Sequence, residues 1–199
     1  MSRSKGLFIT LEGIDGCGKS TQSARLSEWL TRKTGRDTIR TFEPGGYPEG
    51  MRLREFLLEN RNLSPMTELL LFLADRAEHA AKVIAPALEN GRNVVCERWN
   101  ESTMAYQSSP QVKALIAACS FPEPDAKIFL DVEPELAASR LAARAKMDKF
   151  EEEGLTFMKR VAERYRALDM LKIPCGELGE DGVFALIVRE LEGHLWPSR

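Results

Sequence analysis

The sequence predicts an α/β fold: three layers, α/β/α, around a five-stranded parallel sheet. Two observations predict it. Short apolar runs alternate with segments of helical apolar spacing, which is typical of parallel strands joined by right-handed crossover helices. The length of 199 residues suits one well-buried core, so we expect residues 1–199 to form a single domain.

The N-terminal segments predict a strand, a helix and a second strand. Leu7–Leu11 is short, apolar and followed by glycines, as in a buried parallel strand. Helical spacing runs from Lys19 to Lys33, and Gly35 is a typical helix end. A second strand is expected at 38–42, ended by the Glu-Pro-Gly-Gly turn at 43–46.

Two helices and a third strand are expected next. The first helix covers about 50–60, and a longer one covers about 65–89. Asn90-Gly91 is a good C-terminal signal for the longer helix. Pro86 should kink its last turns, because proline lacks the N–H that a helix interior needs. The third strand is expected at 93–96.

The C-terminal half repeats the alternation. A fourth strand is expected at 126–131, and Pro134 suits the first turn of a helix over 135–145. The following segment is highly charged and lacks an apolar stripe, so we interpret 144–153 as a mobile lid, with a solvated charged loop as the alternative. The remaining predicted elements are helices at 155–170 and 181–192 and a weak strand at 172–175.

Composition excludes several classes of function. The formal net charge is −2, so nothing indicates nucleic-acid wrapping or an anionic membrane surface. The longest apolar run, 69–74, is far too short to span a bilayer. Four widely spaced cysteines without a Cys-x-x-Cys pair indicate reduced thiols. We therefore expect a cytoplasmic protein without nucleic-acid or membrane partners.

Residues 13–20 match the P-loop pattern GxxxxGK[ST] at every position. In such a loop, backbone N–H groups and a helix N-terminus surround the phosphates. We expect Lys19 to reach the β- and γ-phosphates of ATP and Ser20 to ligate Mg²⁺. The predicted ATP-binding residues of the loop are Gly13, Ile14, Asp15, Gly16, Cys17, Gly18, Lys19, Ser20 and Thr21. Asp15 has two open interpretations: it pins the loop, or it binds an acceptor hydroxyl.

Further motifs resemble the thymidylate kinase family. They are Glu43–Gly46, Leu69–His79 and Ser102–Gln107, together with 13–21 and 130–135, in the order and approximate spacing of that family. The resemblance covers residues 8 to about 168. It implies the P-loop nucleoside monophosphate kinase type of fold, ATP as phosphoryl donor, Mg²⁺, dTMP as substrate and a homodimer.

Phe72 and Arg76 lie four apart, on one helix face, so they can share a pocket. The family match implies that Phe72 stacks on thymine and that Arg76 bonds the O4 atom of the base. On the spacing alone, a core position on an amphipathic helix would be the favoured interpretation of Phe72. The match also places Tyr106 beside the sugar, on an expected helix start, with Thr103 and Gln107 near the base.

Two arginines, Arg54 and Arg98, resemble those that hold the acceptor phosphate, a task that suits bidentate guanidinium contacts. Considered singly, each would more often be a surface ion-pair residue. Glu43 and Pro44 complete the predicted substrate site. Glu97 replaces the usual aspartate after the third strand and keeps the carboxylate that would face Mg²⁺.

The lid departs from the family pattern. Bacterial relatives without a P-loop arginine carry catalytic arginines in the lid, whereas Lys149 stands at one such position here. We therefore expect Arg144 and Lys149 to be the catalytic cations, together with Lys19, Asp15 and Arg98, and Arg140 to contact ATP.

The predicted reaction is transfer of the γ-phosphoryl group of ATP to dTMP, in the biosynthesis of dTDP. Two alternatives stay open at this point. Tyr47, Met51 and Trp99 depart from the family pattern and leave room for another, modified pyrimidine deoxynucleotide as substrate. A P-loop protein that binds nucleotide without catalysis is the second.

Overall fold

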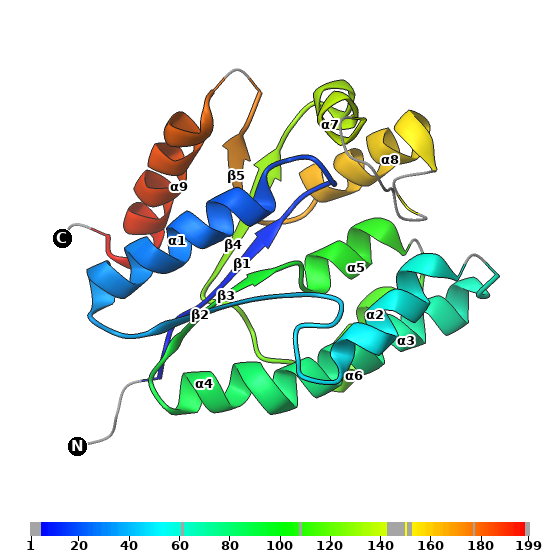
Figure 1. Ribbon diagram of the computed structural model, residues 1–199, viewed down its shortest axis with the longest axis horizontal. Coiled ribbons are helices and arrows are strands. Elements are labelled where there is room, and N and C mark those ends of the chain that lie inside the picture. The colour runs from blue at the N-terminus through cyan, green and yellow to red at the C-terminus, as the bar shows by residue number, and fades with distance from the viewer. Residues whose placement is uncertain are drawn as a thin grey trace.

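The computed structural model describes residues 5–60, 62–107, 109–142, 150, 153–176 and 178–197. A central sheet lies between layers of helices (Figure 1). The strands are β1 (Phe8–Glu12), β2 (Thr38–Phe42), β3 (Asn93–Glu97), β4 (Ala126–Asp131) and β5 (Leu171–Pro174). The helices are α1 (Lys19–Thr34), α2 (Gly50–Glu59), α3 (Pro65–His79), η1 (Ala80–Ile84), α4 (Ala85–Glu89), α5 (Asn100–Tyr106), α6 (Val112–Cys119), α7 (Pro134–Leu141), α8 (Gly154–Arg166) and α9 (Glu180–Leu195).

All neighbouring strands are parallel, in the order β2-β3-β1-β4-β5. The predicted α/β fold with a five-stranded parallel sheet is confirmed. The chain adds β2 and β3 on one side of β1 and then β4 and β5 on the other. The carboxyl end of β1 therefore lies where the strand order reverses, which is the usual ligand site of an open α/β sheet.

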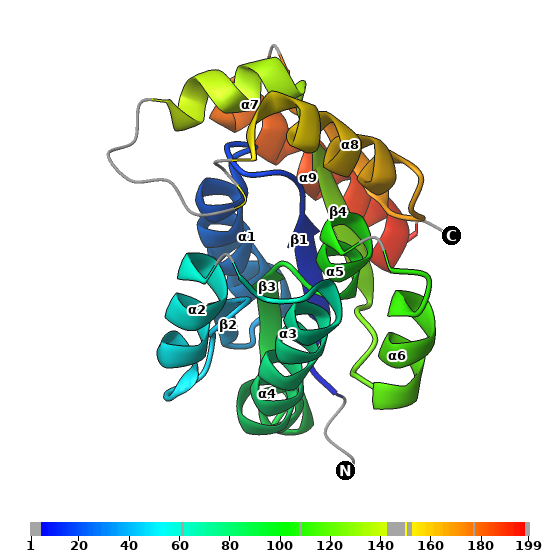
Figure 2. The same cartoon turned by 90° about the vertical axis from the view of Figure 1, so that its right-hand side faces the viewer.

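The two faces of β1 pack against different helices (Figures 1 and 2). Ile9 and Leu11 belong to the core that contains Leu26 of α1 and Ile187 of α9. Phe8 points the other way, into a second core with α4. Because side chains alternate along a strand, Glu12 lies on the same face as Phe8. This alternation decides what Glu12 contacts.

The predicted helix over 65–89 is interrupted. It divides into α3, a turn of π-helix (η1) and α4, and the N–H of Ala85 donates to the carbonyl of Ala80, five residues earlier. In place of the kink expected at Pro86, the structure therefore has this wider turn immediately before the proline. Proline cannot donate to the preceding turn, and a single π-turn relieves the clash.

Other boundaries differ by a few residues, and two predictions need correction. Tyr106 is the last residue of α5 and not near a helix start, because α5 begins directly after β3 at Asn100. Helix α6 was not predicted; Val112, Leu115 and Ile116 form its inner face and pack in a core with α3, whereas its alanines and Cys119 are exposed. No helix in the described part of the chain is both long and apolar enough to cross a membrane.

Candidate active site

The loop between β1 and α1 forms a phosphate cradle. Gly13, Gly16 and Gly18 have φ values of 146°, 82° and 98°, in the left-handed region that favours glycine. A Cβ atom at Gly16 would lie 2.5 Å from the carbonyl oxygen of Ala137, so the loop also needs a residue without a side chain there. The N-terminus of α1 has no side-chain cap, which leaves its first N–H groups for a phosphate.

Lys19 lies over this loop. Its Nζ is 2.9 Å from the carbonyl oxygens of both Gly13 and Ile14 and 4.0 Å from a carboxylate oxygen of Asp15. The ammonium group is thus held at the mouth of the cradle. The side chains of Ile14 and Cys17 are buried in the core, so only their backbone atoms are available to a nucleotide.

Ser20 and Glu97 provide a hard oxygen pair beside the cradle. Ser20 Oγ donates to Glu97 Oε2 at 2.8 Å, and Ser23 Oγ donates to the other carboxylate oxygen at 2.6 Å. Glu97 reaches α1 because β3 is the neighbour of β1 in the sheet. A hydroxyl and a carboxylate fit Mg²⁺, which is usually bound by one or two protein oxygens together with phosphates and waters.

Arg98 occupies the centre of the site. Its φ of 72° is unusual for a residue with a side chain, and several contacts hold it. Its Nη2 donates to Asp15 Oδ1 at 2.6 Å and to the Tyr106 hydroxyl at 3.2 Å, and Nη1 donates to Gly13 O and Ser102 Oγ at 3.3 Å. The hydroxyl of Tyr106 in turn donates to Asp15 Oδ2 at 3.0 Å.

This cluster fixes two protonation states. Burial alone would raise the pKa of Asp15, but the positive charges of Arg98 and Lys19 outweigh it and hold that pKa well below its ordinary value. Burial raises the pKa of Tyr106 far above its ordinary value. The site therefore presents an ionised Asp15 and a neutral Tyr106 at physiological pH.

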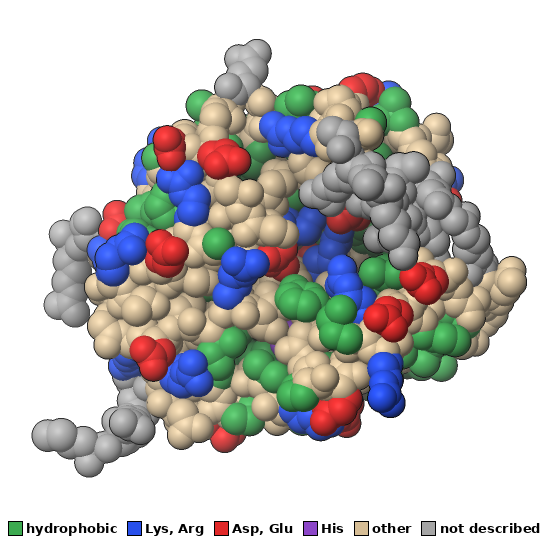
Figure 3. All heavy atoms as spheres, viewed as in Figure 1, with side chains coloured by type: hydrophobic (Ala, Val, Ile, Leu, Met, Phe, Trp, Pro, Cys, Tyr) green, Lys and Arg blue, Asp and Glu red, His purple; other side chains and the backbone are tan. Residues whose placement is uncertain are grey.

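A second cleft adjoins the phosphate cradle and contains every residue predicted to bind substrate. They are Asp15, Glu43, Pro44, Arg54, Phe72, Arg76, Arg98, Thr103, Tyr106 and Gln107. The cleft on the phosphate side is lined by Lys19, Ser20, Thr21, Glu97 and others. Asp15, Glu43, Arg54 and Arg98 line both. These four mark the junction between the two clefts, and Figure 3 shows basic and acidic side chains gathered in the hollow there.

Arg76 is more deeply buried than the sequence predicted, with 2% of its surface exposed. Its Nε donates to Glu43 at 2.8 Å, Nη1 donates to Thr103 Oγ1 at 2.9 Å and to Asn100 at 3.3 Å, and Nη2 donates to the carbonyl of Trp99 at 3.0 Å. Arg76 therefore holds the wall of the cleft together as well as lining it.

Phe72 and Tyr106 flank the apolar side of the cleft together with Phe150, whose ring centroid is 6.2 Å from that of Phe72 and 5.6 Å from that of Tyr106. Phe150 was not predicted to line the site, since it lies within the charged segment interpreted as a lid. Arg40, which lines the phosphate side 3.8 Å from Glu97, was not predicted either. Nothing in the spacing of either residue indicates a site.

The lid predictions have different outcomes. Arg140 donates from Nη1 to the carbonyl oxygen of Gly16 at 3.2 Å, so it contacts the phosphate loop from α7. Arg144 and Lys149 lie outside the described residues, and the same holds for most of the expected lid at 144–153.

A P-loop with a hydroxyl–carboxylate pair, joined through two arginines to an aromatic cleft, defines a P-loop nucleotide phosphotransferase. The comparisons agree. A family model described as thymidylate kinase matches residues 11–172. Thymidylate kinase from Jannaschia sp. (strain CCS1) is 44% identical over 171 residues, covering 81% of this chain and 82% of that protein. The enzyme from Synechococcus sp. (strain JA-3-3Ab) is 46% identical, covering 81% of each.

Solved structures are similar too. Thymidylate kinase from Ehrlichia chaffeensis superposes with a TM-score of 0.73 at 28% identity, over 94% of this chain and 98% of that one. The Candida albicans enzyme, with a TM-score of 0.77 over 94% and 92% of the two chains, is 24% identical and supports the fold alone. The chain belongs to the thymidylate kinase family, and its reaction is the phosphorylation of dTMP to dTDP.

Proposed function

We propose that this chain transfers the γ-phosphoryl group of ATP to dTMP across the junction at Asp15, Glu43, Arg54 and Arg98. The observation that carries the proposal is that these four residues line both clefts. A donor phosphate in the P-loop and an acceptor phosphate at the two arginines would then meet end to end. Such positioning, with charge neutralisation, supplies most of the catalysis in phosphoryl transfer.

On the donor side, the loop amides and Lys19 bind the ATP phosphates, Thr21 and Arg140 contribute further contacts, and Ser20 and Glu97 hold Mg²⁺. Bound Mg²⁺ would offset charge on the phosphate oxygens. Lys19 already points its ammonium group at the mouth of the cradle, where that charge develops. Arg144 and Lys149 are proposed as further cations from the sequence pattern alone.

On the acceptor side, Arg98 and Arg54 hold the phosphate of dTMP. Asp15 fixes the direction of the Arg98 guanidinium, so its role is to orient. Phe72 stacks on thymine, Arg76, Thr103 and Gln107 bind its polar edge, and Tyr106 crowds the 2′ position of the sugar. Glu43 and Pro44 keep Arg76 and Arg54 in place, through the Glu43 carboxylate and the Pro44 carbonyl oxygen, respectively.

We also propose that the chain acts as a homodimer, as a single domain in each subunit, in the cytoplasm. An apolar stripe on α3 supports the dimer: Met66, Leu70, Ala74 and Ala77 are all exposed and lie on one helix face. The neighbouring helix α6 also exposes alanines. Light scattering of wild type and Leu70→Glu tests this, since a charge in a dimer interface should yield monomers.

The test of the reaction is a coupled ADP-release assay with dTMP, dUMP, dCMP and AMP as acceptors. We expect dTMP to be the preferred acceptor and Lys19→Ala to abolish turnover while the circular dichroism spectrum stays unchanged. A clear preference for another pyrimidine deoxynucleotide would favour the modified-substrate alternative. ATP binding without turnover on any acceptor would favour a binding protein.

A further inference from the structure

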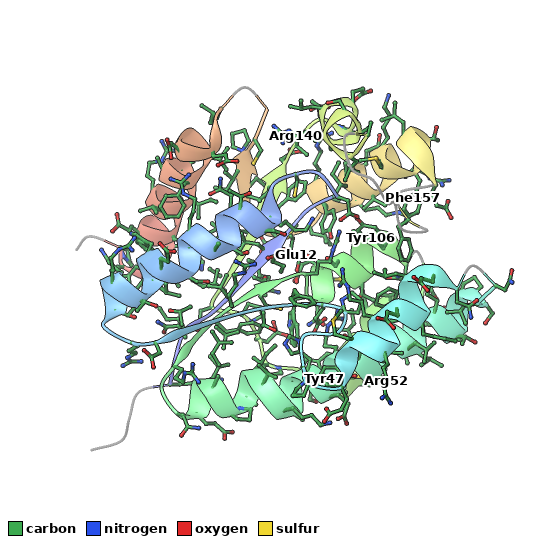
Figure 4. All side chains as sticks on the ribbon, viewed as in Figure 1. Glu12, Tyr47, Arg52, Tyr106, Arg140 and Phe157 are labelled. Carbon is green, nitrogen blue, oxygen red and sulfur yellow. The ribbon has the colours of Figure 1, made fainter. Side chains whose placement is uncertain are left out.

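Glu12 is a buried carboxyl group that the proposed reaction does not use. It is the last residue of β1, fully buried, on the sheet face opposite α1. Figure 4 shows it in the interior of the molecule, whereas Arg140 lies near the surface. A buried carboxyl without a direct role needs a physical explanation, because an unpaired buried charge is costly.

The contacts of Glu12 lead to the centre of the active site. Ser102 Oγ donates to Glu12 Oε2 at 2.6 Å, and the Tyr165 hydroxyl donates to the same oxygen at 3.4 Å. Ser102 and Tyr165 lie 2.7 Å apart, and both accept hydrogen bonds from Arg98 Nη1, at 3.3 Å and 3.5 Å. Glu12 thus accepts hydrogen bonds from the same two hydroxyl groups that accept hydrogen bonds from Arg98.

The second carboxyl oxygen of Glu12 has no hydrogen-bond partner in the described part of the chain. Among the described residues, Glu12 Oε1 and Glu101 Oε2 are both buried without a hydrogen bond. Glu101 is also buried, and Lys127 binds its first oxygen at 2.8 Å. A proton on Glu12 removes one of the two negative charges that would otherwise repel each other in this buried region.

We propose that Glu12 is a positioning residue for phosphoryl transfer and that it acts in its protonated form, holding Ser102 and Tyr165 beneath Arg98. The inference rests on the role proposed above for Arg98. An ionised Glu12 would place a second carboxylate near Arg98, in competition with Asp15 and the acceptor phosphate. A neutral Glu12 keeps the geometry and leaves the guanidinium charge for the phosphate.

The surroundings are consistent with this state. Burial and the charge of Glu101 raise the pKa of Glu12 to about 7, against the lowering effects of Ser102, Arg98 and Arg76. The titratable and charged groups that face Glu12 are Arg76 from α3, Cys96 from β3, Arg98 from the turn after β3, Glu101 from α5 and Tyr165 from α8, with Lys127 of β4 bound to Glu101.

Infrared difference spectroscopy of wild type against Glu12→Gln tests the protonation directly. At pH 6 we expect a protonated-carboxyl band that Glu12→Gln lacks and that disappears in wild type as the pH rises through about 7. Absence of this band would overturn the proposal. The measurement is independent of turnover, so it stands even if the role of Arg98 proves wrong.

Kinetics test the positioning. Glu12→Gln, which mimics the protonated acid, should keep kcat within about threefold, whereas Glu12→Ala should lower it at least tenfold, or about 1.4 kcal/mol, with little change in the KM for ATP. The decline of kcat above pH 7 in wild type should vanish in Glu12→Gln. Thr10→Val, on the same face of β1, removes a buried hydroxyl that has no hydrogen-bond partner among the described residues, and it should match wild type. Equal losses in Glu12→Gln and Glu12→Ala, or parallel pH profiles in wild type and Glu12→Gln, would overturn the proposal.

Discussion

Arg98 and Asp15 form an ion pair of 2.6 Å where the donor and acceptor clefts meet. The pair joins the loops after two neighbouring strands, because Asp15 follows β1 and Arg98 follows β3. Tyr106 bridges both partners from α5. The guanidinium is therefore held in one orientation before any phosphate arrives, which is the preorganisation that phosphoryl transfer needs.

The first prediction concerns this pair. Arg98→Lys keeps the charge but loses the planar fork, so it cannot hold Asp15, Tyr106 and a phosphate together. We expect kcat/KM for dTMP to fall by about a hundredfold or more. Arg52→Lys is the matched control, since Arg52 is exposed on α2 and absent from both clefts. Similar steady-state constants for Arg98→Lys and wild type would contradict the role of Arg98.

Arg76 gives a prediction with two parts. Arg76→Ala should raise the KM for dTMP much more than that for ATP, through loss of a charge-assisted bond of about 2–3 kcal/mol to the base. It should also lower the free energy of unfolding by about 3–5 kcal/mol, because Glu43 would be left as a buried charge without its guanidinium partner.

Urea denaturation and kinetics separate the two parts. The double variant Arg76→Met, Glu43→Gln should recover stability relative to Arg76→Ala without recovering dTMP binding. An equal rise in the KM values of both substrates would instead indicate that the role of Arg76 is purely structural.

A pH-dependent stability is expected from Asp75. Burial raises its pKa to about 6 from 3.8, although the Gly45 N–H donates to its carboxylate. Because the folded pKa is above the unfolded one, the Asp75 contribution is fully present below pH 3.8 and is lost as the pH rises through about 6.

Asp75→Asn stays neutral and keeps an acceptor for Gly45. As the pH rises from 4 to 7, the free energy of unfolding of Asp75→Asn should therefore rise relative to that of wild type by about 3 kcal/mol. Urea titrations at several pH values measure this difference. A constant difference across that range would mean that Asp75 does not change its charge there.

Sugar selection should depend on the ring of Tyr106. Tyr106→Phe keeps the ring that crowds the 2′ position, whereas Tyr106→Ala should admit the ribose form of TMP more readily. Tyr106→Phe also removes the hydrogen bond to Asp15, so a modest loss of kcat is expected without a change in discrimination. The measurement is the ratio of kcat/KM for dTMP to that for the ribose form of TMP. An unchanged ratio in Tyr106→Ala would show that Tyr106 does not select the sugar.

The sequence predicted those parts of the fold and site that depend on local patterns. Strand bounds at 38–42 and 126–131 agree with β2 and β4, and the P-loop has the predicted strand–turn–helix context. The substrate residues meet in one cleft because the carboxyl ends of parallel strands share an edge.

What the sequence could not predict depends on long-range contacts. The Arg76–Glu43 pair joins residues 33 apart, and Glu12 meets Tyr165 across 153 positions. No periodicity encodes such pairs. The π-turn at 80–84 also lies outside local patterns. It accommodates Pro86, which cannot donate a hydrogen bond to the preceding turn, whereas helix propensity alone predicts a kink there.

The last prediction assigns the main lid cation to Arg144. The P-loop has Ile14, Asp15 and Cys17 at variable positions, so it provides no arginine of its own. Arg140 bonds the Gly16 carbonyl, which fits a residue that holds the loop and less one that follows the transferring group. Lys149 provides a point charge without the bidentate fork.

Arg144→Ala should therefore lower kcat about a hundredfold with modest changes in both KM values, because its contact forms mainly in the transition state. Arg140→Ala should chiefly raise the KM for ATP, and Lys149→Ala should cost less kcat than Arg144→Ala. Steady-state kinetics of the three variants decide the matter: a larger kcat loss in Lys149→Ala would reverse the assignment.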